Sequence, residues 1–164
     1  MSQVPRGVSL EVAMDWRVRP NSDASNRLIK IALRSAFALD FRRGSLSVAV
    51  VGKTRMSALH RLHCGVPGPT DVITFDYGSR RNAGYLDGEI IVCADVAAAQ
   101  SGGPRSGRRF ITELSLYLIH GMLHLAGYDD TTPAAFRALH RREDQLLRRM
   151  GMKAARIHQA PPRT

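Results

Sequence analysis

The spacing of apolar side chains predicts two kinds of element in the first part of the chain. Residues 9–16 alternate between apolar and polar side chains, which is the pattern of a β-strand with one buried face. The segment 21–23 offers an N-cap, and residues 24–41 then repeat apolar positions at helical spacing. This second pattern predicts an amphipathic helix whose inner face carries Leu28, Ile31, Ala32 and Ser35.

Glycine and proline divide the rest of the chain into further elements. Strands are expected after Gly44, at 71–77 and at 89–93, and helices are expected at 56–63, 94–100, 109–126 and 133–150. Asp87 and Gly88 are interpreted as a turn into the strand at 89–93. Thr132 is expected to cap the last helix, and the solvent face of that helix is expected to carry Arg137, Arg141, Arg142, Arg148 and Arg149.

The order of these elements is β-α-β-α-β-β-α-α-α, which predicts an α+β fold with one small mixed sheet of four strands covered by helices. We expect a single domain over residues 1–152 and a polar C-terminal tail over 153–164. A length of 164 residues is enough for a hydrophobic core without disulfide or metal staples.

The charge balance adds a candidate partner. The chain has 24 Lys and Arg residues against 14 Asp and Glu residues, a formal net charge of +10, and nearly all of the basic residues are arginines. Arginine carries a planar fork of donors that suits phosphate groups, so the composition favours a polyanionic partner, with nucleic acid first. The alternative is a solvated cationic surface with no specific partner.

Cysteine content and segment hydropathy bear on the cellular compartment. Cys64 and Cys93 are far apart in the sequence and form no C-x-x-C pair, which favours a reducing compartment, and Cys93 ends an apolar strand as a core residue would. No secretory signal is visible, and no apolar run approaches the roughly 20 residues that a membrane helix needs. We therefore expect a cytoplasmic protein without a membrane partner.

The segment H-G-M-L-H-L-A-G-Y-D-D, residues 120–130, predicts a metal site on the central helix at 109–126. His120 and His124 are one helical turn apart and share a face, and Gly127 allows the chain to leave the helix and fold back. Asp130 can then reach the same ion, with Asp129 as its competitor. Two imidazoles and a carboxylate leave one position open for water, as in catalytic zinc sites, so we expect one Zn²⁺ per chain and hydrolytic chemistry.

Other roles near this segment stay open from the residues alone. Glu113 lies two helical turns before His120 and is expected either to orient that histidine or to pair with a nearby arginine. A metallopeptidase of the H-E-x-x-H class has the same histidine spacing, but it needs a glutamate where this chain has Gly121. Two histidines and a carboxylate also occur in iron oxygenases, although no other residue here supports oxygen chemistry.

Three segments together resemble the YbeY family of endoribonucleases. The segment 120–130 is similar to that family's metal motif, P-T-D-V-I-T-F at 69–75 is similar to its P-T-D strand, and G-E-I-I-V-C at 88–93 is similar to a strand between the two. The resemblance runs from about Leu10 to Met150. It implies a zinc-bearing α+β fold, cleavage of single-stranded or ribosomal RNA, a role in ribosomal RNA maturation and ribosome quality control, and partners on the ribosomal subunit.

The chain departs from the family pattern at two positions. Asp130 stands where the family has a third histidine, and Cys64 stands where it has an arginine. A carboxylate still binds zinc, but a thiol cannot supply a cation to the phosphate. We therefore predict catalytic roles for His120 and for Arg61, which lies one turn before Cys64 and can replace the family arginine or merely face solvent. The main alternative is a ribosome-binding or rRNA-binding factor that carries zinc without catalysis.

Overall fold

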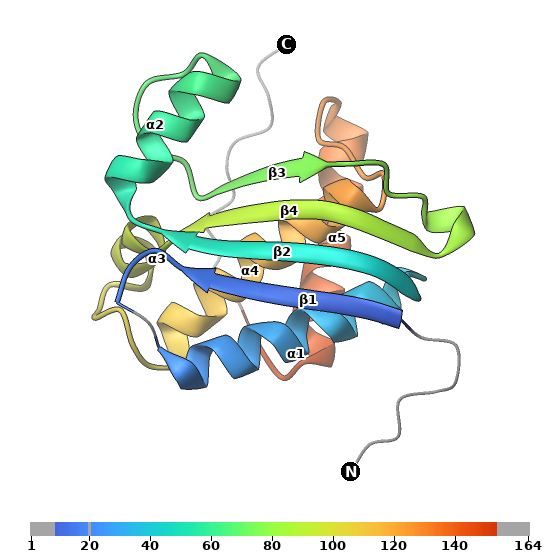
Figure 1. The fold of residues 1–164 in the computed structure, drawn as a ribbon, viewed down its shortest axis with the longest axis horizontal. Helices are drawn as coiled ribbons and strands as arrows, with labels where there is room; N and C mark the ends of the chain where they lie inside the picture. The colour runs from blue at the N-terminus through green and yellow to red at the C-terminus, as the bar shows by residue number, and fades with distance from the viewer. Residues whose placement is uncertain (1–8, 20, 154–164) are drawn as a thin grey trace.

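A mixed sheet forms the centre of the fold in the computed structural model, which describes residues 9–19 and 21–153 (Figure 1). Its strands lie in the order β1 (Ser9–Trp16), β2 (Arg43–Val51), β4 (Tyr85–Cys93) and β3 (Val72–Asp76). The strands β1, β2 and β4 run parallel to one another, whereas β3 pairs antiparallel with β4. The prediction of an α+β fold with a mixed sheet of four strands is confirmed.

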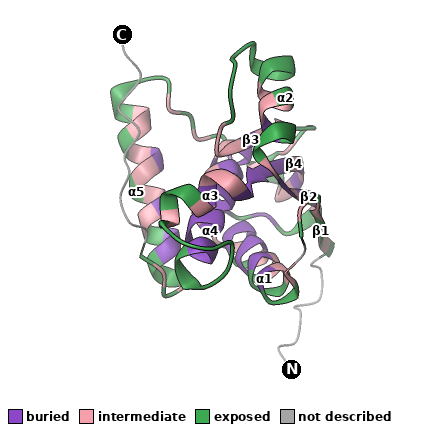
Figure 2. Cartoon of the chain, turned by 90° about the vertical axis from the view of Figure 1, so that its left-hand side faces the viewer, coloured by how far each residue is buried: buried purple, intermediate pink, exposed green. Residues whose placement is uncertain are grey.

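The helices cover the two faces of the sheet unequally. On one face lie α1 (Ser22–Ala38) and α4 (Arg108–Leu125), and α5 (Pro133–Arg149) packs against α4 (Figure 1). On the other side of the sheet lies α2 (Lys53–Cys64), which extends beyond its edge (Figure 2). The short helix α3 (Ala94–Ser101) completes the predicted order of elements, and the 3₁₀ turn η1 (Arg81–Ala83) between β3 and β4 is an addition to it.

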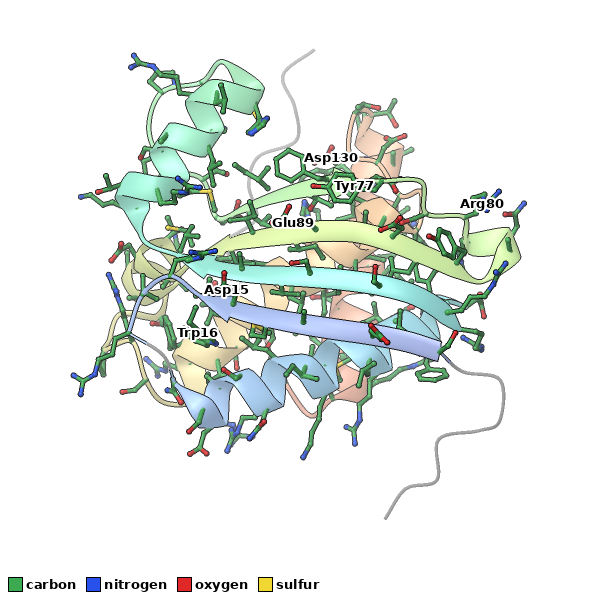
Figure 3. The ribbon with its side chains drawn as sticks, viewed as in Figure 1. Asp15, Trp16, Tyr77, Arg80, Glu89 and Asp130 are labelled. Atoms are coloured by element: carbon green, nitrogen blue, oxygen red, sulfur yellow. The ribbon has the colours of Figure 1, made fainter. Side chains whose placement is uncertain are left out.

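The main core lies between the sheet and the helices α1, α4 and α5. It includes the inward side chains of β2 and β4 and the predicted inner face of α1, since Leu28, Ile31, Ala32 and Ser35 are all buried. A smaller core lies under α2 on the opposite face, where Met56 packs with Val51, Ile73, Ile91 and Cys93. Beyond α2 this second face is open and carries polar side chains, including Asp15 and Glu89, which Figure 3 labels.

The prediction of a turn at Asp87 and Gly88 is wrong. Both residues lie inside β4, where they pair with Ser45 and Leu46 of β2. Gly88 is required there by close packing, since an added Cβ would lie 2.8 Å from both a Leu125 methyl and the Phe75 carbonyl oxygen.

Arg142 is also not a free member of the solvent face of α5. Its guanidinium donates to the carbonyl oxygen of Ala38 at 2.9 Å, so it satisfies a carbonyl at the C-terminal end of α1. The predicted cap of α5 is confirmed, because the Thr132 hydroxyl accepts from the amide of Ala135. The predicted tail at 153–164 lies almost wholly outside the described residues.

Candidate metal centre

The end of α4 folds back as the glycine predicts. Gly127 has a φ of +91°, and the amides of Gly127 and Tyr128 donate to the carbonyls of His124 and Leu123. These two hydrogen bonds are those of a Schellman motif, which ends a helix and reverses the chain. The reversal carries Asp130 back toward the last turns of α4.

The structure brings together the three residues that the sequence predicts as metal ligands. One ligand atom from each of His120, His124 and Asp130 lies within 4.8 Å of the others. All three residues are partly buried. Asp129, the competing carboxylate, instead accepts hydrogen bonds from the amide and hydroxyl of Thr131. The described geometry therefore favours Asp130 over Asp129 as the third ligand.

The donor atoms fit a divalent ion. The Nε2 atoms of His120 and His124 face each other at 3.0 Å. Two nitrogen ligands of a tetrahedral zinc ion lie roughly 3.3 Å apart, given Zn–N bonds of about 2.05 Å. Two neutral imidazole lone pairs at this distance repel unless a cation or a proton lies between them. A bound metal would relieve this repulsion and would use Asp130 as its third ligand.

Glu143 of α5 orients the first histidine, and sequence reasoning missed it. Its carboxylate lies 2.5 Å from Nδ1 of His120 and 2.6 Å from Nδ1 of His140. A carboxylate beside Nδ1 keeps the proton on that nitrogen and leaves the Nε2 lone pair for a metal. The available signal was a glutamate on the apolar stripe of α5, beside Leu139 and Leu146, which are fully buried.

Glu113 does not take the orienting role. It is buried beside Tyr117, and burial raises the pKa of its carboxyl, against the opposing effect of the Tyr117 hydroxyl. Two helical turns separate it from His120 by about 10.5 Å along the axis, too far for a carboxylate to reach the ring. Of the two roles left open for Glu113, the orientation of His120 is excluded, because the orienting carboxylate comes from Glu143 of the neighbouring helix.

The two histidines differ in their affinity for protons. Burial lowers the pKa of His120, but the hydrogen bond and the negative charge of Glu143 outweigh it, so the net pKa is raised. Burial and the neighbouring His120 lower the pKa of His124. Of the two imidazoles, His120 therefore holds an additional proton more strongly than His124 does. A metal ion competes with that proton for the same pair of nitrogens.

Replacing Glu143 by glutamine is expected to weaken zinc binding about 10- to 100-fold, because the His120 ring loses the carboxylate that fixes its tautomer and orientation. The affinity is measured by titration against a competing zinc chelator. Glu113→Gln is the matched control, since it changes a buried carboxyl that lies beside Tyr117, two helical turns from His120. Equal zinc affinity in the two variants, with unchanged thermal unfolding, would contradict the role of Glu143.

A cleft of about 370 Å³ is lined in part by His120 and His124, two of the three candidate metal ligands. Its walls come from α4, from the segment around β3, and from α2, and the lining residues of α2 are His60 and Cys64. Thus the residue that replaces the family arginine does face the cleft. Arg61 is exposed and is not among the lining residues, so its catalytic role stays a prediction.

The loop before β3 also contributes to the cleft. Thr70 lines it, and its hydroxyl donates to the carboxylate of Asp71 at 3.1 Å. The same carboxylate oxygen of Asp71 accepts from the amide of Val72. Asp71 therefore caps the start of β3, while Thr70 presents its side chain to the cleft.

Comparison with known families places this site in context. The sequence model described as endoribonuclease YbeY matches residues 16–151, which is most of the chain. The chain belongs to the YbeY family. A YbeY endoribonuclease of Anaeromyxobacter sp. strain Fw109-5 is 35% identical over 140 residues, covering 85% of this chain and 71% of the relative. Another from Thermobifida fusca is 32% identical over 152 residues, covering 85% of this chain and 92% of the relative.

A solved structure supports the same fold. The solution structure of TM1509 from Thermotoga maritima superimposes with a TM-score of 0.53 at 23% sequence identity. The match covers 85% of this chain and 91% of that chain. The likeness to TM1509 supports the α+β architecture alone, and the sequence matches carry the assignment to the YbeY family.

The packing of α4 also argues against the peptidase alternative. A peptidase of that class needs a glutamate at the position of Gly121. A Cβ at Gly121 would lie 2.8 Å from the Thr74 hydroxyl and 2.9 Å from a methyl of Ile90. Gly121 therefore faces the sheet, where a glutamate side chain has no room. The absence of the peptidase glutamate agrees with the assignment to the YbeY family.

Proposed function

We propose that this protein is a zinc-dependent endoribonuclease that cleaves single-stranded RNA in ribosomal RNA maturation and ribosome quality control. The observation that carries the proposal is the group of His120, His124 and Asp130 beside a cleft, in a chain of the YbeY family. Relatives that the chain matches over most of its length are named endoribonucleases.

His120, His124 and Asp130 would hold the zinc ion, with Glu143 keeping the proton on Nδ1 of His120. A zinc ion bound there supplies a Lewis acid for the phosphoryl oxygen and lowers the pKa of a coordinated water. The chain's own contribution is to fix the ligands through α4 and α5 and to hold the substrate phosphate in the cleft. Arg61 remains a proposed second contributor, through its charge.

The electrostatics of the chain agree with an RNA substrate. The formal net charge of +10 attracts a polyanion and gives an affinity for phosphate that does not depend on base sequence. The proposed partners are accordingly ribosomal RNA and the ribosomal subunit that contains it. Among the described helices, none is both long and apolar enough to cross a bilayer. Zinc as the resident metal and a cytoplasmic location are part of the proposal.

A second candidate function is a ribosome-bound factor whose zinc is structural. The observation that favours it is Cys64, which lines the cleft where the family pattern has a cation. By analogy with the loss of one oxyanion-hole donor, loss of a charge stabiliser beside the phosphoryl group is expected to cost about 10²- to 10³-fold in rate. A factor of this kind would bind ribosomal RNA and release no fragments.

The purified protein is expected to cleave single-stranded RNA, to lose this activity in a zinc chelator, and to regain it when zinc is returned, because the proposed chemistry needs the ion. Fragment release is followed on a labelled single strand and on the same strand annealed to its complement. Cleavage that persists in the chelator would contradict zinc dependence. RNA binding without fragments, at about one zinc per chain, would favour the binding factor.

A further inference from the structure

The helix α2 contributes a further histidine, His60, to the wall of the cleft. His60 and Cys64 are one helical turn apart, so they share the face of α2 that lines the cleft with His120 and His124. The same stripe of α2 begins with Met56, which is fully buried in the smaller core and thereby fixes the rotation of the helix. His60 therefore faces the cleft as a consequence of core packing.

The ring of His60 is anchored on one side. Its Nδ1 lies 2.9 Å from the carbonyl oxygen of Gly68, in the loop between α2 and β3. A carbonyl oxygen can only accept, so Nδ1 carries a hydrogen and donates it. The nitrogen left for a ligand in the cleft is then Nε2, to which the structure assigns no partner among the described residues. Histidines that transfer protons in enzymes are held in this way.

We propose that His60 is the proton donor to the leaving oxygen of the phosphodiester bound in this cleft, an inference that rests on the proposed function. A water oxygen forms a bond to phosphorus, and the bond from phosphorus to the leaving ribose oxygen breaks. The electron pair stays on the ribose oxygen, which takes the proton from Nε2 of His60. The attacking water releases its own proton to solvent, and the neutral imidazole regains one from solvent.

The other cleft residues are less suited to this step. The carboxylate of Asp76 is already engaged by the amides of Gly78 and Ser79. Thr70 and Thr74 offer hydroxyls, which give up a proton only at high pH, and His120 and His124 point their Nε2 atoms at each other.

The inference is tested with two substrates that differ in their need for a proton. Departure of a ribose oxygen from RNA requires one, whereas departure of nitrophenolate from bis(p-nitrophenyl) phosphate does not. On the zinc-loaded protein, His60→Ala and His60→Gln are expected to slow RNA cleavage by about 10²-fold or more. The same variants are expected to hydrolyse the aryl ester at nearly the wild-type rate. Zinc content, and RNA affinity measured without zinc, are expected to stay unchanged.

His63→Ala is the matched control, because His63 lies on the same helix, packs edge-on against Phe75 and is not among the residues that line the cleft. Its rates on both substrates are expected to match those of the wild type. Undiminished RNA cleavage in His60→Ala would overturn this inference alone, and so would equal losses on the two substrates. A wild-type protein that hydrolyses neither substrate would overturn the proposed function, and this inference with it.

Discussion

Replacing His124 by alanine is expected to remove the metal and, with it, RNA cleavage. The variant keeps His120 and Asp130, but two ligands hold zinc far less tightly than three. Loss of a hydrogen bond that merely supports a ligand costs 10- to 100-fold in metal affinity, so loss of the ligand itself should cost more than about 100-fold. Zinc measured by elemental analysis after gel filtration is expected to fall from about one ion per chain to near zero.

Two neighbouring carboxylates provide the matched comparison for this experiment. Asp130→Ala is expected to lose zinc and cleavage as His124→Ala does, because its carboxylate lies with the two imidazoles. Asp129→Ala should keep both, since Asp129 serves the turn through Thr131. Equal zinc in all three variants and the wild type would refute the assigned ligands. Full zinc with lost cleavage in His124→Ala would point to a different metal site.

The grouping of His120, His124 and Asp130 was predictable because these residues are local in sequence. A helical spacing of four and a glycine stop define where the two rings and the next carboxylate lie, whatever the rest of the fold does. The supporting carboxylate was not predictable in this way. Glu143 lies 23 residues from His120, on another helix, and only the packing of α5 against α4 brings them together. Helical periodicity within α4 pointed instead to Glu113, which lies too far along the axis.

The same limit applies to the wall that α2 contributes to the cleft. The sequence predicted a helix at 56–63 but not which of its faces lines the cleft. The burial of Met56 against the sheet decides this rotation, and it turns His60 and Cys64 to the cleft. Arg61 is the next residue after His60 in α2, so its side chain leaves the helix about 100° away from that of His60. Whether its long side chain serves a bound phosphate stays a prediction.

The sequence predicted strands correctly where apolar and polar side chains alternate. It predicted a turn incorrectly where a glycine makes room for a tertiary contact. Alternation gave β1 with its observed bounds, Ser9–Trp16. Asp87 and Gly88 resemble a turn in sequence, but the glycine makes room for Leu125 of α4 against the sheet. A glycine that relieves a tertiary contact cannot be distinguished from a turn glycine by local sequence.

Gly44 in β2 is such a packing glycine. Among the proposed substitutions, Gly44→Ala is expected to lower the free energy of unfolding most. Its φ is +112°, and a Cβ built on it would lie 1.9 Å from the carbonyl oxygen of Leu86 in β4. A non-glycine residue at such a φ costs about 1–3 kcal/mol before any clash is counted. Because the clash is with backbone inside the paired strands, no side chain can move aside to relieve it. The free energy of unfolding should therefore fall by more than about 3 kcal/mol.

Urea denaturation of Gly44→Ala and Gly103→Ala at matched zinc content measures this difference. Gly103 has no atom within 4 Å of an added Cβ, so its variant should stay within about 0.5 kcal/mol of the wild type. The Gly44 variant should shift the midpoint with little change in slope if it alters stability and not the unfolded state. A midpoint equal to that of Gly103→Ala would mean that β2 and β4 can separate locally. In that case, the register that pairs Gly44 with Leu86 would not be essential for holding β4, the strand that pairs with β3 in the wall of the cleft.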